Sequence, residues 1–271
     1  MDTTGLFNLF LLILIYIYIG YLFFLLFCLK RKLESASQDE FNFHVSFLIP
    51  AKNEESIIEK KIENCFQLDY PKDKIEFIVI SDGSTDNTVQ IVKGYKHHNV
   101  KLIELKENRG KTEAQNIAVQ QAQGEIIIFS DANAMYDKDA VKHMVRHFED
   151  PEVGCVSGEL HYLEDMNNPV GTEESLYWKY EKTIKKLEDR FNSIIGANGS
   201  IYTVRKRDYI PLESDIISDF IEPLEVKYHG KKVVYEPLAE SYEKSSTSFD
   251  QELKRKRRII CRSIYSLLKP D

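Results

Sequence analysis

The chain has 271 residues, 43% of them hydrophobic, and a formal net charge of −7. This length allows one or two domains with a sizeable core. The acidic balance gives no indication of a nucleic-acid partner, so none is expected. The four cysteines are scattered without a Cys-x-x-Cys pair, which argues against zinc and redox motifs and suits a reducing compartment.

Residues 6–29 are almost entirely apolar, interrupted only by Asn8 and Gly20. As a helix this segment would be about 36 Å long, enough to cross a hydrocarbon core of about 30 Å. A cleaved signal peptide is the alternative, but such a peptide has a basic start and a shorter apolar run. Here the start carries Asp2 and no Lys or Arg. We therefore expect a single transmembrane helix.

Positive charge follows the apolar run, at Lys30, Arg31 and Lys32. The positive-inside rule then predicts that the N-terminus lies outside and that residues 30–271 lie in the cytoplasm, at the cytoplasmic (inner) membrane of the cell. The expected organisation is a transmembrane anchor at 1–32, a polar juxtamembrane linker at 33–43 and one cytoplasmic domain at 44–271.

Short apolar runs alternate with helical patterns in the first half of this domain. The expected strands are 44–49, 75–80, 101–105 and 125–129, and the expected helices are 54–67, 86–97, 111–122 and 137–149. This alternation predicts an α/β fold with a mostly parallel, doubly wound sheet and helices on both faces. Ligands of such sheets bind beyond the carboxyl ends of the strands, where Pro50, Asp82 and Asp131 lie.

The second half of the domain is less regular. We expect a long amphipathic helix at 172–190, a glycine-interrupted strand at 194–204, a further strand at 232–236 and a helix at about 249–267.

Two strand ends carry polar groups that suit a nucleoside. The first predicted strand ends at Pro50, and Glu54 follows where a helix opens, so Glu54 is a candidate partner for a base or ribose. A carboxylate there is equally consistent with an ordinary helix N-terminus. The next strand runs into Asp82, and because a helix follows, Asp82-Gly83 is not a hairpin turn. Asp82 is a candidate acceptor for base or ribose donors, whereas Asp86 is interpreted as a helix cap.

The segment Asn108-Arg109-Gly110-Lys111-Thr112 contains a Gly-Lys-Thr triplet. A phosphate-binding P-loop needs a glycine five residues before Gly110, and that position is Leu105, so a P-loop is excluded. A helix N-terminus carrying Lys111 can still meet phosphate. An ordinary solvated basic turn is the alternative.

Asp131-Ala132-Asn133 follows a buried strand. Asp-x-Asn by itself often marks only a turn, but at a strand end it presents two oxygen ligands. Such oxygens suit Mg²⁺ or Mn²⁺, with substrate phosphates completing the coordination.

In this order and spacing the motifs resemble the family 2 inverting glycosyltransferases with a GT-A fold. The resemblance covers about residues 44–262, and it implies a membrane-anchored, bacterial-type enzyme that uses Mg²⁺ or Mn²⁺. It implies that Glu54 and Asp82 contact the nucleoside of the donor, with Lys111 nearby, and that Asp131 and Asn133 flank the metal. The family usually shows Asp-x-Asp, so Asn133 is a departure that leaves the metal preference open.

The resemblance extends to the acceptor side. The stretch that includes Gly196, Asn198 and Gly199 matches a glycine-rich segment near the acceptor, although a loop or bulge between strands is the alternative. Asp219 stands where the family has an acidic pair before a helix. It is the expected general base, which takes the proton from the acceptor hydroxyl. Asp215 is the rival, and helix capping is the alternative for either.

The basic cluster at 254–258 has two interpretations. It stands where processive relatives carry Gln-x-x-Arg-Trp, and Arg258 keeps the arginine of that motif while the aromatic residue is absent. Arg258 is therefore the expected partner of the departing diphosphate. A basic helix lying at an anionic membrane leaflet is the other interpretation, and both can hold together.

The expected activity is inverting, metal-dependent sugar transfer from a nucleotide-diphosphate donor, with UDP as the expected nucleotide, to a lipid-linked or polysaccharide acceptor. The alternative is a shortened, non-catalytic, membrane-anchored nucleotide-sugar-binding protein, because the chain stops at Asp271 while many members of the family that it resembles continue into further membrane helices. A dinucleotide-dependent enzyme is disfavoured, since no Gly-x-Gly-x-x-Gly follows the first strand.

Overall fold

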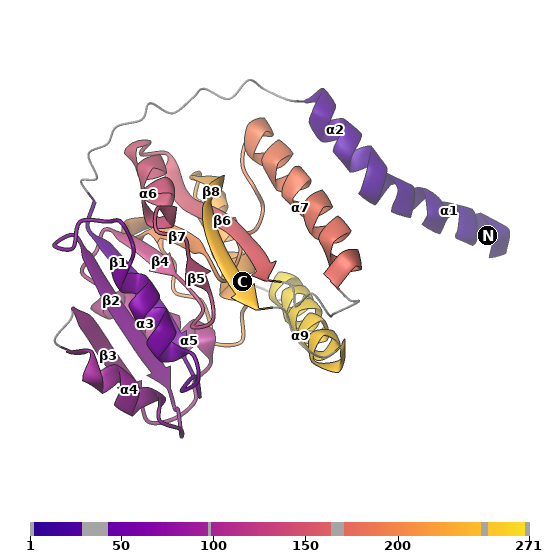
Figure 1. Cartoon of the computed structure of the whole chain (residues 1–271). Helices are drawn as coiled ribbons and strands as arrows, with labels where there is room; N and C mark the ends of the chain where they lie inside the picture. The colour runs from indigo at the N-terminus through magenta and orange to yellow at the C-terminus, as the bar shows by residue number, and fades with distance from the viewer. Residues whose placement is uncertain (1–2, 29–42, 97–98, 164–170, 245–248, 269–271) are drawn as a thin grey trace.

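The computed structural model describes residues 3–28, 43–96, 99–163, 171–244 and 249–268. It contains a long apolar helix at the N-terminus and an α/β domain built on one eight-stranded sheet (Figure 1). The cluster Lys30–Lys32 and nearly all of the predicted linker 33–43 lie outside the described residues.

One half of the sheet is parallel. Strand β1 (Val45–Ala51) pairs with β2 (Ile75–Asp82) on one side and with β4 (Ile126–Phe129) on the other, and β3 (Val100–Leu105) pairs with β2. These are the four strands that the sequence predicts. Their near-continuous apolar runs are buried because helices cover both faces.

The other half of the sheet is mixed. β7 (Tyr202–Arg205) runs antiparallel between β4 and β6 (Val153–Leu163), while β8 (Lys232–Lys244) is parallel to β6 and antiparallel to β5 (Met135–Tyr136). The strand order is therefore β3-β2-β1-β4-β7-β6-β8-β5.

The sequence prediction was incomplete in this half. No strand was expected at 153–163, because Gly154, Gly158 and several polar residues hide its apolar pattern. β8 was expected to end at 236, since Pro237 follows, but the pairing of β6 with β8 is irregular there, between Ser157 and Glu159, and tolerates the proline. Of the predicted strand 194–204 only the last part, β7, is a strand.

Helices cover the sheet on both faces, as predicted. They are α3 (Ile58–Phe66), α4 (Thr88–Gly94), α5 (Lys111–Gln121), α6 (Ala140–Val145), α7 (Gly171–Phe191), α8 (Ser218–Tyr228) and α9 (Phe249–Leu268), with 3-10 turns η3 (Arg146–Glu149) and η4 (Lys206–Asp208). Ile62 and Met144 from α3 and α6 pack with Phe47 on one face. Ala118 and Val226 from α5 and α8 pack on the other.

The N-terminal helix is continuous from Thr3 to Phe27, through α1 (Thr3–Ile15), a π-helical turn η1 (Tyr16–Gly20) and α2 (Tyr21–Phe27). The helix has 25 residues, and an 18-residue window of it has a mean hydropathy of 2.7 and is 6% buried, so the helix is a candidate membrane span. It contacts α7: Tyr21 Oη donates to Glu188 Oε1 at 2.7 Å, and Tyr180 Oη donates to the Tyr18 carbonyl at 2.9 Å. Figure 1 shows the two helices side by side.

The α8 face of the core contains a buried carboxyl group. Glu222 is fully buried, and its Oε1 accepts a hydrogen bond from the Ile210 backbone N–H at 3.1 Å. Burial raises the pKa of Glu222 to about 8, although the hydrogen bond from Ile210 acts to lower it. The folded protein therefore holds this carboxyl in its protonated form through neutral pH.

We predict that Glu222→Gln stabilises the protein increasingly between pH 5 and pH 8. The pKa is raised from 4.5 to about 8 in the folded state, so the stability that protonation contributes is fully present below pH 4.5 and is lost as the pH rises toward 8. The loss is up to about 1.4 kcal/mol per pH unit. Glutamine keeps an acceptor for Ile210 and removes the charge.

The measurement is the difference in Tm between Glu222→Gln and the unsubstituted protein at pH 5, 7 and 9. Glu63→Gln, at an exposed position of α3, is the control, and its Tm difference should not change with pH. A difference for Glu222→Gln that is also constant across this range would contradict the prediction.

Candidate active site

The carboxyl ends of β1, β2 and β4 meet at one edge of the sheet, because these strands are parallel and in register. Pro50 lies opposite Ile80, and Leu48 lies opposite Phe129. The residues that follow, including Asp82 and Asp131, therefore converge at this edge, as the sequence predicts.

The loops after β1 and β2 hold each other through side-chain hydrogen bonds. Asn53 adopts a left-handed backbone conformation with φ 55°, and its Oδ1 accepts from Thr85 N at 2.8 Å. Glu55 Oε2 accepts from Asn87 N at 3.0 Å. Glu54 lies between these contacts, and its carboxylate makes no hydrogen bond with any described residue. Burial, followed by the charges of Asp131 and Asp86, raises the pKa of this half-buried group.

Asp86 lies one residue before Asn87, which is the N-cap residue of α4, and it contacts the first residue of the helix. Its Oδ1 accepts from the backbone N–H of Thr88 at 3.0 Å and from the Thr88 hydroxyl at 2.6 Å, at the start of α4.

Asp82 organises the loop before α5. Its carboxylate is buried and accepts from Asn108 Nδ2 at 3.0 Å, Arg109 N at 2.7 Å and Gly110 N at 2.9 Å. Gly83 allows the loop before α5 to lie close to the end of β2. It has φ 66°, and a Cβ there would lie 2.6 Å from Asn108 N. Three of the roughly four acceptor positions of the carboxylate are thus used inside the protein.

Lys111 joins two parts of the site. It begins α5, and its Nζ lies 2.5 Å from Asp131 Oδ1 and 3.4 Å from the Gly199 carbonyl. Burial acts to lower the pKa of Lys111, but the charges of Asp131 and Asp219 outweigh it and raise that pKa. Lys111 therefore stays positively charged between the two carboxylates.

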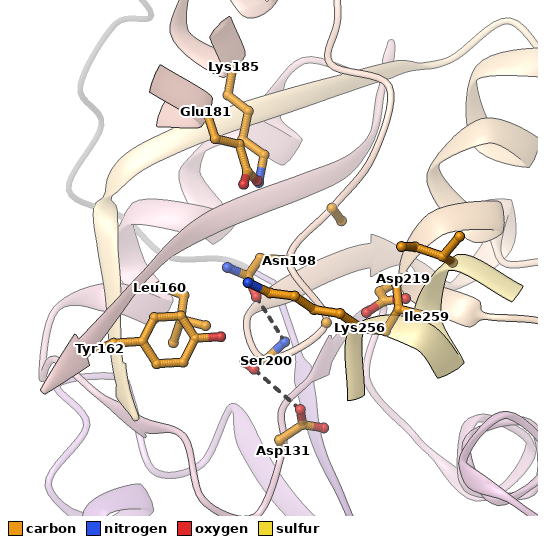
Figure 2. Close-up of a pocket in the computed structure, with 13 residues that line it drawn as sticks. Asp131, Leu160, Tyr162, Glu181, Lys185, Asn198, Ser200, Asp219, Lys256 and Ile259 are labelled. Atoms are coloured by element: carbon orange, nitrogen blue, oxygen red, sulfur yellow. Dashed lines mark hydrogen bonds and ion pairs between the residues drawn. The ribbon is translucent and has the colours of Figure 1, made fainter. Parts of the chain in front are cut away.

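A pocket of about 540 Å³ opens beside Asp131. Its lining comes from six parts of the chain and is shown in Figure 2: Asp131, Leu160, Tyr162, Glu181, Lys185, Ala197, Asn198, Gly199, Ser200, Asp219, Lys256, Ile259 and Ile260. Ser200 Oγ donates to Asp131 Oδ2 at 3.2 Å, so both oxygens of Asp131 have a partner. The pocket unites the predicted metal residue Asp131, the predicted acceptor residues Asn198 and Gly199, and the predicted base Asp219.

Asp219 lies in the first turn of α8, directly against Gly199. A Cβ added at Gly199 would lie 2.1 Å from Asp219 Oδ2, so the glycine makes room for the carboxylate. The Asp219 carbonyl accepts from Ala197 N at 3.1 Å, which ties the glycine-rich loop to α8. Asp215, the rival base, does not line the pocket.

The Gly-Lys-Thr segment also fixes the chain that leads to Asp219. Thr112 Oγ1 donates to the Ile216 carbonyl at 2.7 Å, and Asn116 Nδ2 donates to the Leu212 carbonyl at 2.7 Å. Tyr209 Oη donates to Asn116 Oδ1 at 2.7 Å. One side of α5 thereby carries Lys111 and positions the loop before α8.

Several predicted residues lie outside the pocket lining. Pro50, Glu54 and Asp82 lie at the neighbouring strand ends, Asn133 is exposed beyond Asp131, and Gly196 lies next to the lining residue Ala197. Arg258 is exposed on α9 and is not part of the lining, whereas Lys256 of the same helix is. The role of Arg258 stays a prediction.

The oxygens of Asp131 and Asn133 fit a cation that is shared with a bound ligand. Carboxylate and amide oxygens are hard ligands that suit Mg²⁺ or Mn²⁺. No group of three or more His, Cys, Asp or Glu side chains arranged for a metal occurs in the described part of the chain. The protein therefore offers few ligands of its own at this turn, and phosphate oxygens would complete the coordination. The contact with Lys111 shows that Asp131 already accommodates positive charge.

Sequence reasoning missed some of the pocket residues. Ser200 is the last residue of the glycine-rich stretch, but only Gly196, Asn198 and Gly199 of that stretch were predicted as acceptor residues. Leu160 and Tyr162 are two residues apart on β6, and that spacing marks one face of a strand. Glu181 and Lys185 are four residues apart on the predicted helix and form an ion pair at 2.9 Å. A predicted strand at 153–163 would have pointed to Leu160 and Tyr162.

Known proteins resemble this chain in sequence and in fold. The family model described as "Glycosyl transferase family 2" matches residues 46–210. A poly-beta-1,6-N-acetyl-D-glucosamine synthase from Staphylococcus aureus strain COL is 29% identical over 202 residues, which are 72% of this chain and 48% of that protein. The chain thus spans about half the length of the curated relatives it matches.

Two solved structures are similar in fold. The mannosyltransferase PcManGT from Pyrobaculum calidifontis, in complex with GDP-Man and Mn²⁺, has a TM-score of 0.77 and 21% identity over 96% of this chain and 75% of that one. S. aureus TarS in complex with UDP-GlcNAc has a TM-score of 0.56 and 19% identity over 76% and 59% of the two chains. At these identities they establish the fold, which is the predicted GT-A fold. With its family model covering the strands and loops that build the site, this chain belongs to glycosyl transferase family 2.

Proposed function

We propose that this chain transfers a sugar from a nucleotide-diphosphate donor to an acceptor hydroxyl, with inversion at the anomeric carbon. The observation that carries the proposal is the shared pocket: Asp131, paired with Lys111, and Asp219 line the same cavity of about 540 Å³. One carboxylate lies at a cation-accepting strand end and the other beside an open acceptor space. A two-substrate transfer needs both.

The donor nucleoside binds at the edge formed by β1 and β2. Glu54 supports this assignment because its half-buried carboxylate has no hydrogen-bond partner among the described residues, and Asp82 because it has one acceptor position to spare. Pro50 closes the end of β1 beside them. Base and ribose present N–H and O–H donors, which suit two acidic acceptors.

The diphosphate lies between this edge and Asp131. Lys111 offers it a positive charge, and Asp131 with Asn133 would hold a divalent cation on it. When bound, Mg²⁺ or Mn²⁺ supplies neutralisation of charge on the leaving diphosphate. Mn²⁺ in the complex of PcManGT supports the use of a divalent metal.

Asp219 acts as the general base. The acceptor hydroxyl attacks the anomeric carbon, its proton passes to the Asp219 carboxylate, and the bond from that carbon to the diphosphate oxygen breaks on the opposite side. Asn198 and Gly199 form the wall that orients the acceptor. Arg258, or Lys256 from within the pocket, offers positive charge as the diphosphate leaves.

The names of the relatives suggest which donor and which kind of acceptor to test first. The names poly-beta-1,6-N-acetyl-D-glucosamine synthase and TarS with UDP-GlcNAc support UDP-N-acetylglucosamine as the first donor to test. A lipid-linked or polysaccharide acceptor is consistent with the former name and with the apolar helix of this chain.

The membrane contacts the protein in two places in this proposal. The helix Thr3–Phe27 anchors it, with the domain on the cytoplasmic side because Lys30, Arg31 and Lys32 follow the helix. The second contact is α9, whose exposed large apolar residues are Leu253, Ile259, Ile260, Ile264, Tyr265 and Leu268. Arg257, Arg258 and Arg262 are also exposed on α9. A helix with apolar and basic exposed side chains suits the surface of an anionic bilayer.

The full chain in detergent, incubated with UDP-GlcNAc, UDP-glucose, UDP-galactose or GDP-mannose and membrane extract as acceptor, tests the function. We expect transfer from one of the UDP-sugars with Mn²⁺ or Mg²⁺, and loss of transfer with EDTA. Product analysis by mass spectrometry measures it. Donor binding that is equally tight with EDTA would contradict the metal role of Asp131.

Asp219→Asn is the accompanying test of the base. It should lower kcat by about 10² to 10⁴ while donor affinity is retained. Full turnover by Asp219→Asn would refute the assignment. Nucleotide binding by the unsubstituted protein, with neither transfer nor donor hydrolysis, would favour the non-catalytic alternative.

We predict that Gly199→Ala impairs transfer without impairing donor binding. The new Cβ would lie 2.1 Å from Asp219 Oδ2 and 2.9 Å from its Cγ, so the carboxylate must rotate away from its position in the pocket. Transfer rate and UDP affinity are measured on the same preparation. Gly196→Ala is the matched comparison in the same loop, and it should cause a smaller loss because its Cβ would meet only Phe220 Cδ2 at 3.8 Å. Equal rates for Gly199→Ala and the unsubstituted protein would contradict the prediction.

We predict that α9 contacts anionic lipid. Cys261 is exposed on α9 and can carry a fluorophore once Cys28 is replaced by Ser, since Cys65 and Cys155 are buried. In nanodiscs that contain a nitroxide-labelled lipid, quenching should be stronger with phosphatidylglycerol than with phosphatidylcholine alone. Arg257→Glu with Arg262→Glu should weaken it.

A fluorophore at Gly94→Cys, in a Cys28→Ser and Cys261→Ser background, serves as the control. Gly94 is exposed at the end of α4 with nothing near its Cβ position, and α4 lies at the β3 edge of the sheet. Equal quenching at the two positions, or no dependence on the anionic lipid, would count against the membrane contact.

A further inference from the structure

A lysine lies buried beneath the turn that carries Asp131 and Asn133. Lys61 of α3 has an exposed fraction of 0%, and its Nζ donates to the Ala134 carbonyl. The ammonium also lies over the rings of Tyr136, at 4.4 Å from the centroid, and Phe47, at 5.0 Å. Lys61 thus reaches the turn from the core side of the sheet.

Burying this ammonium is costly. No carboxylate of the described residues lies within ion-pair distance of Nζ, so one carbonyl and two aromatic faces replace its hydration. Burial lowers the pKa of Lys61 to about 8, although the charges of Asp131 and the buried Glu243 act to raise it. A methionine would fill the same space without this cost. We therefore infer that the ammonium group serves to hold the backbone that it contacts at Ala134.

Ala134 belongs to the turn between β4 and β5, and a second residue of α3 holds the same turn. Asn64, one helical turn after Lys61 and on the same face of α3, donates from Nδ2 to the Tyr136 carbonyl at 2.9 Å and accepts at Oδ1 from Tyr136 N at 2.8 Å. Lys61 and Asn64 thus fix two backbone positions, 134 and 136. We call these two residues the α3 clamp.

The clamp continues toward the pocket through Tyr136. The Tyr136 hydroxyl lies 3.2 Å from the Phe129 carbonyl and 3.1 Å from the Ser200 carbonyl. Ser200 in turn donates from Oγ to Asp131. The start of the turn, its end and the hydrogen-bond partner of Asp131 are therefore tied to one buried group of side chains.

We propose that Lys61 and Asn64 are positioning residues for the metal: by holding Ala134 and Tyr136, they keep the oxygens of Asp131 and Asn133 in place for a cation on the donor diphosphate. This proposal depends on the proposed function. Its physical basis is that a short turn offers few contacts of its own and opens easily, so a site with few protein ligands gains affinity when the turn is fixed in advance.

Lys61→Met tests the proposal. Residues that orient metal ligands typically contribute 10- to 100-fold to metal affinity, so Mn²⁺ affinity in the presence of UDP should fall by about tenfold or more. Mn²⁺ binding is measured by electron paramagnetic resonance on the full chain in detergent. UDP affinity without metal should be unchanged, because the loops that carry Glu54 and Asp82 do not depend on the clamp.

Lys60→Met is the matched control, since Lys60 is exposed on the same helix, and its Mn²⁺ affinity should equal that of the unsubstituted protein. Asn64→Ala is the second variant. It keeps the buried lysine, removes both hydrogen bonds to Tyr136, and should show the same selective loss of Mn²⁺ affinity. If Lys61→Met does not fold, Asn64→Ala decides the question.

The outcomes separate this proposal from the proposed function. Folded Lys61→Met or Asn64→Ala with unchanged Mn²⁺ affinity in the presence of UDP overturns the clamp while the proposed function stands. An equal loss of UDP affinity with and without metal also overturns it, because that pattern indicates general loosening of the fold. If the unsubstituted protein shows no Mn²⁺-dependent UDP binding, the metal role in the proposed function is refuted, and the clamp proposal, which depends on that role, is refuted with it.

Discussion

The in-register parallel pairing of β1 with both β2 and β4 is the constraint on which the site depends. Parallel strands send all their outgoing loops from one edge, so the loops after β1, β2 and β4 must satisfy one another's polar groups there. Asp82 accepts hydrogen bonds from the loop before α5, and Asn53 and Glu55 accept hydrogen bonds from the loop after β2. The α3 clamp holds the turn after β4 in the same way. Much of the polar chemistry at this edge is therefore structural, whereas the Glu54 carboxylate has no hydrogen-bond partner among the described residues and Asn133 is exposed.

The balance of charge at the site determines whether a diphosphate would need a cation in order to bind there. Asp131 and Asp219 place two carboxylates at the pocket, Glu54 adds a third at a neighbouring strand end, and Lys111 offsets the charge of Asp131, as its raised pKa reflects. A diphosphate that approached this arrangement alone would meet net repulsion. A divalent cation would reverse the sign locally, which supports the metal dependence that we propose even though Asn133 contributes no charge. A second aspartate at 133 would bind the cation more tightly but would repel the diphosphate more once the cation had left.

The sequence was sufficient where local pattern and tertiary structure agree. Strands β1 to β4 are apolar runs that end in polar residues, so their positions and the meeting of Asp82 with Asp131 could be predicted. β6 could not, because Gly154, Gly158 and Glu159 interrupt its pattern while β8 and α7 bury it. Lys61 resembles an ordinary surface lysine beside Lys60, and only the packing of α3 shows that it points inward. The choice between Arg258 and Lys256 depends on the rotation of α9 about its axis, which the basic run at 254–258 does not specify.

The apolar helix meets the domain through α7, the helix that also borders the pocket with Glu181 and Lys185. A helix of 25 residues is about 37 Å long, about 7 Å more than a hydrocarbon core of about 30 Å. Its contacts with α7, through Tyr18, Tyr21 and Phe24, fall in its second half, toward the end that precedes the domain. If the helix spans a membrane as proposed, the α7 wall of the pocket would lie near the membrane surface, and α9 with Ile259 and Ile260 forms another wall that carries apolar side chains. In the proposed function an acceptor hydroxyl on a lipid-linked molecule would approach Asp219 from that side, and this is the reason to test a membrane-held acceptor before a freely diffusing one.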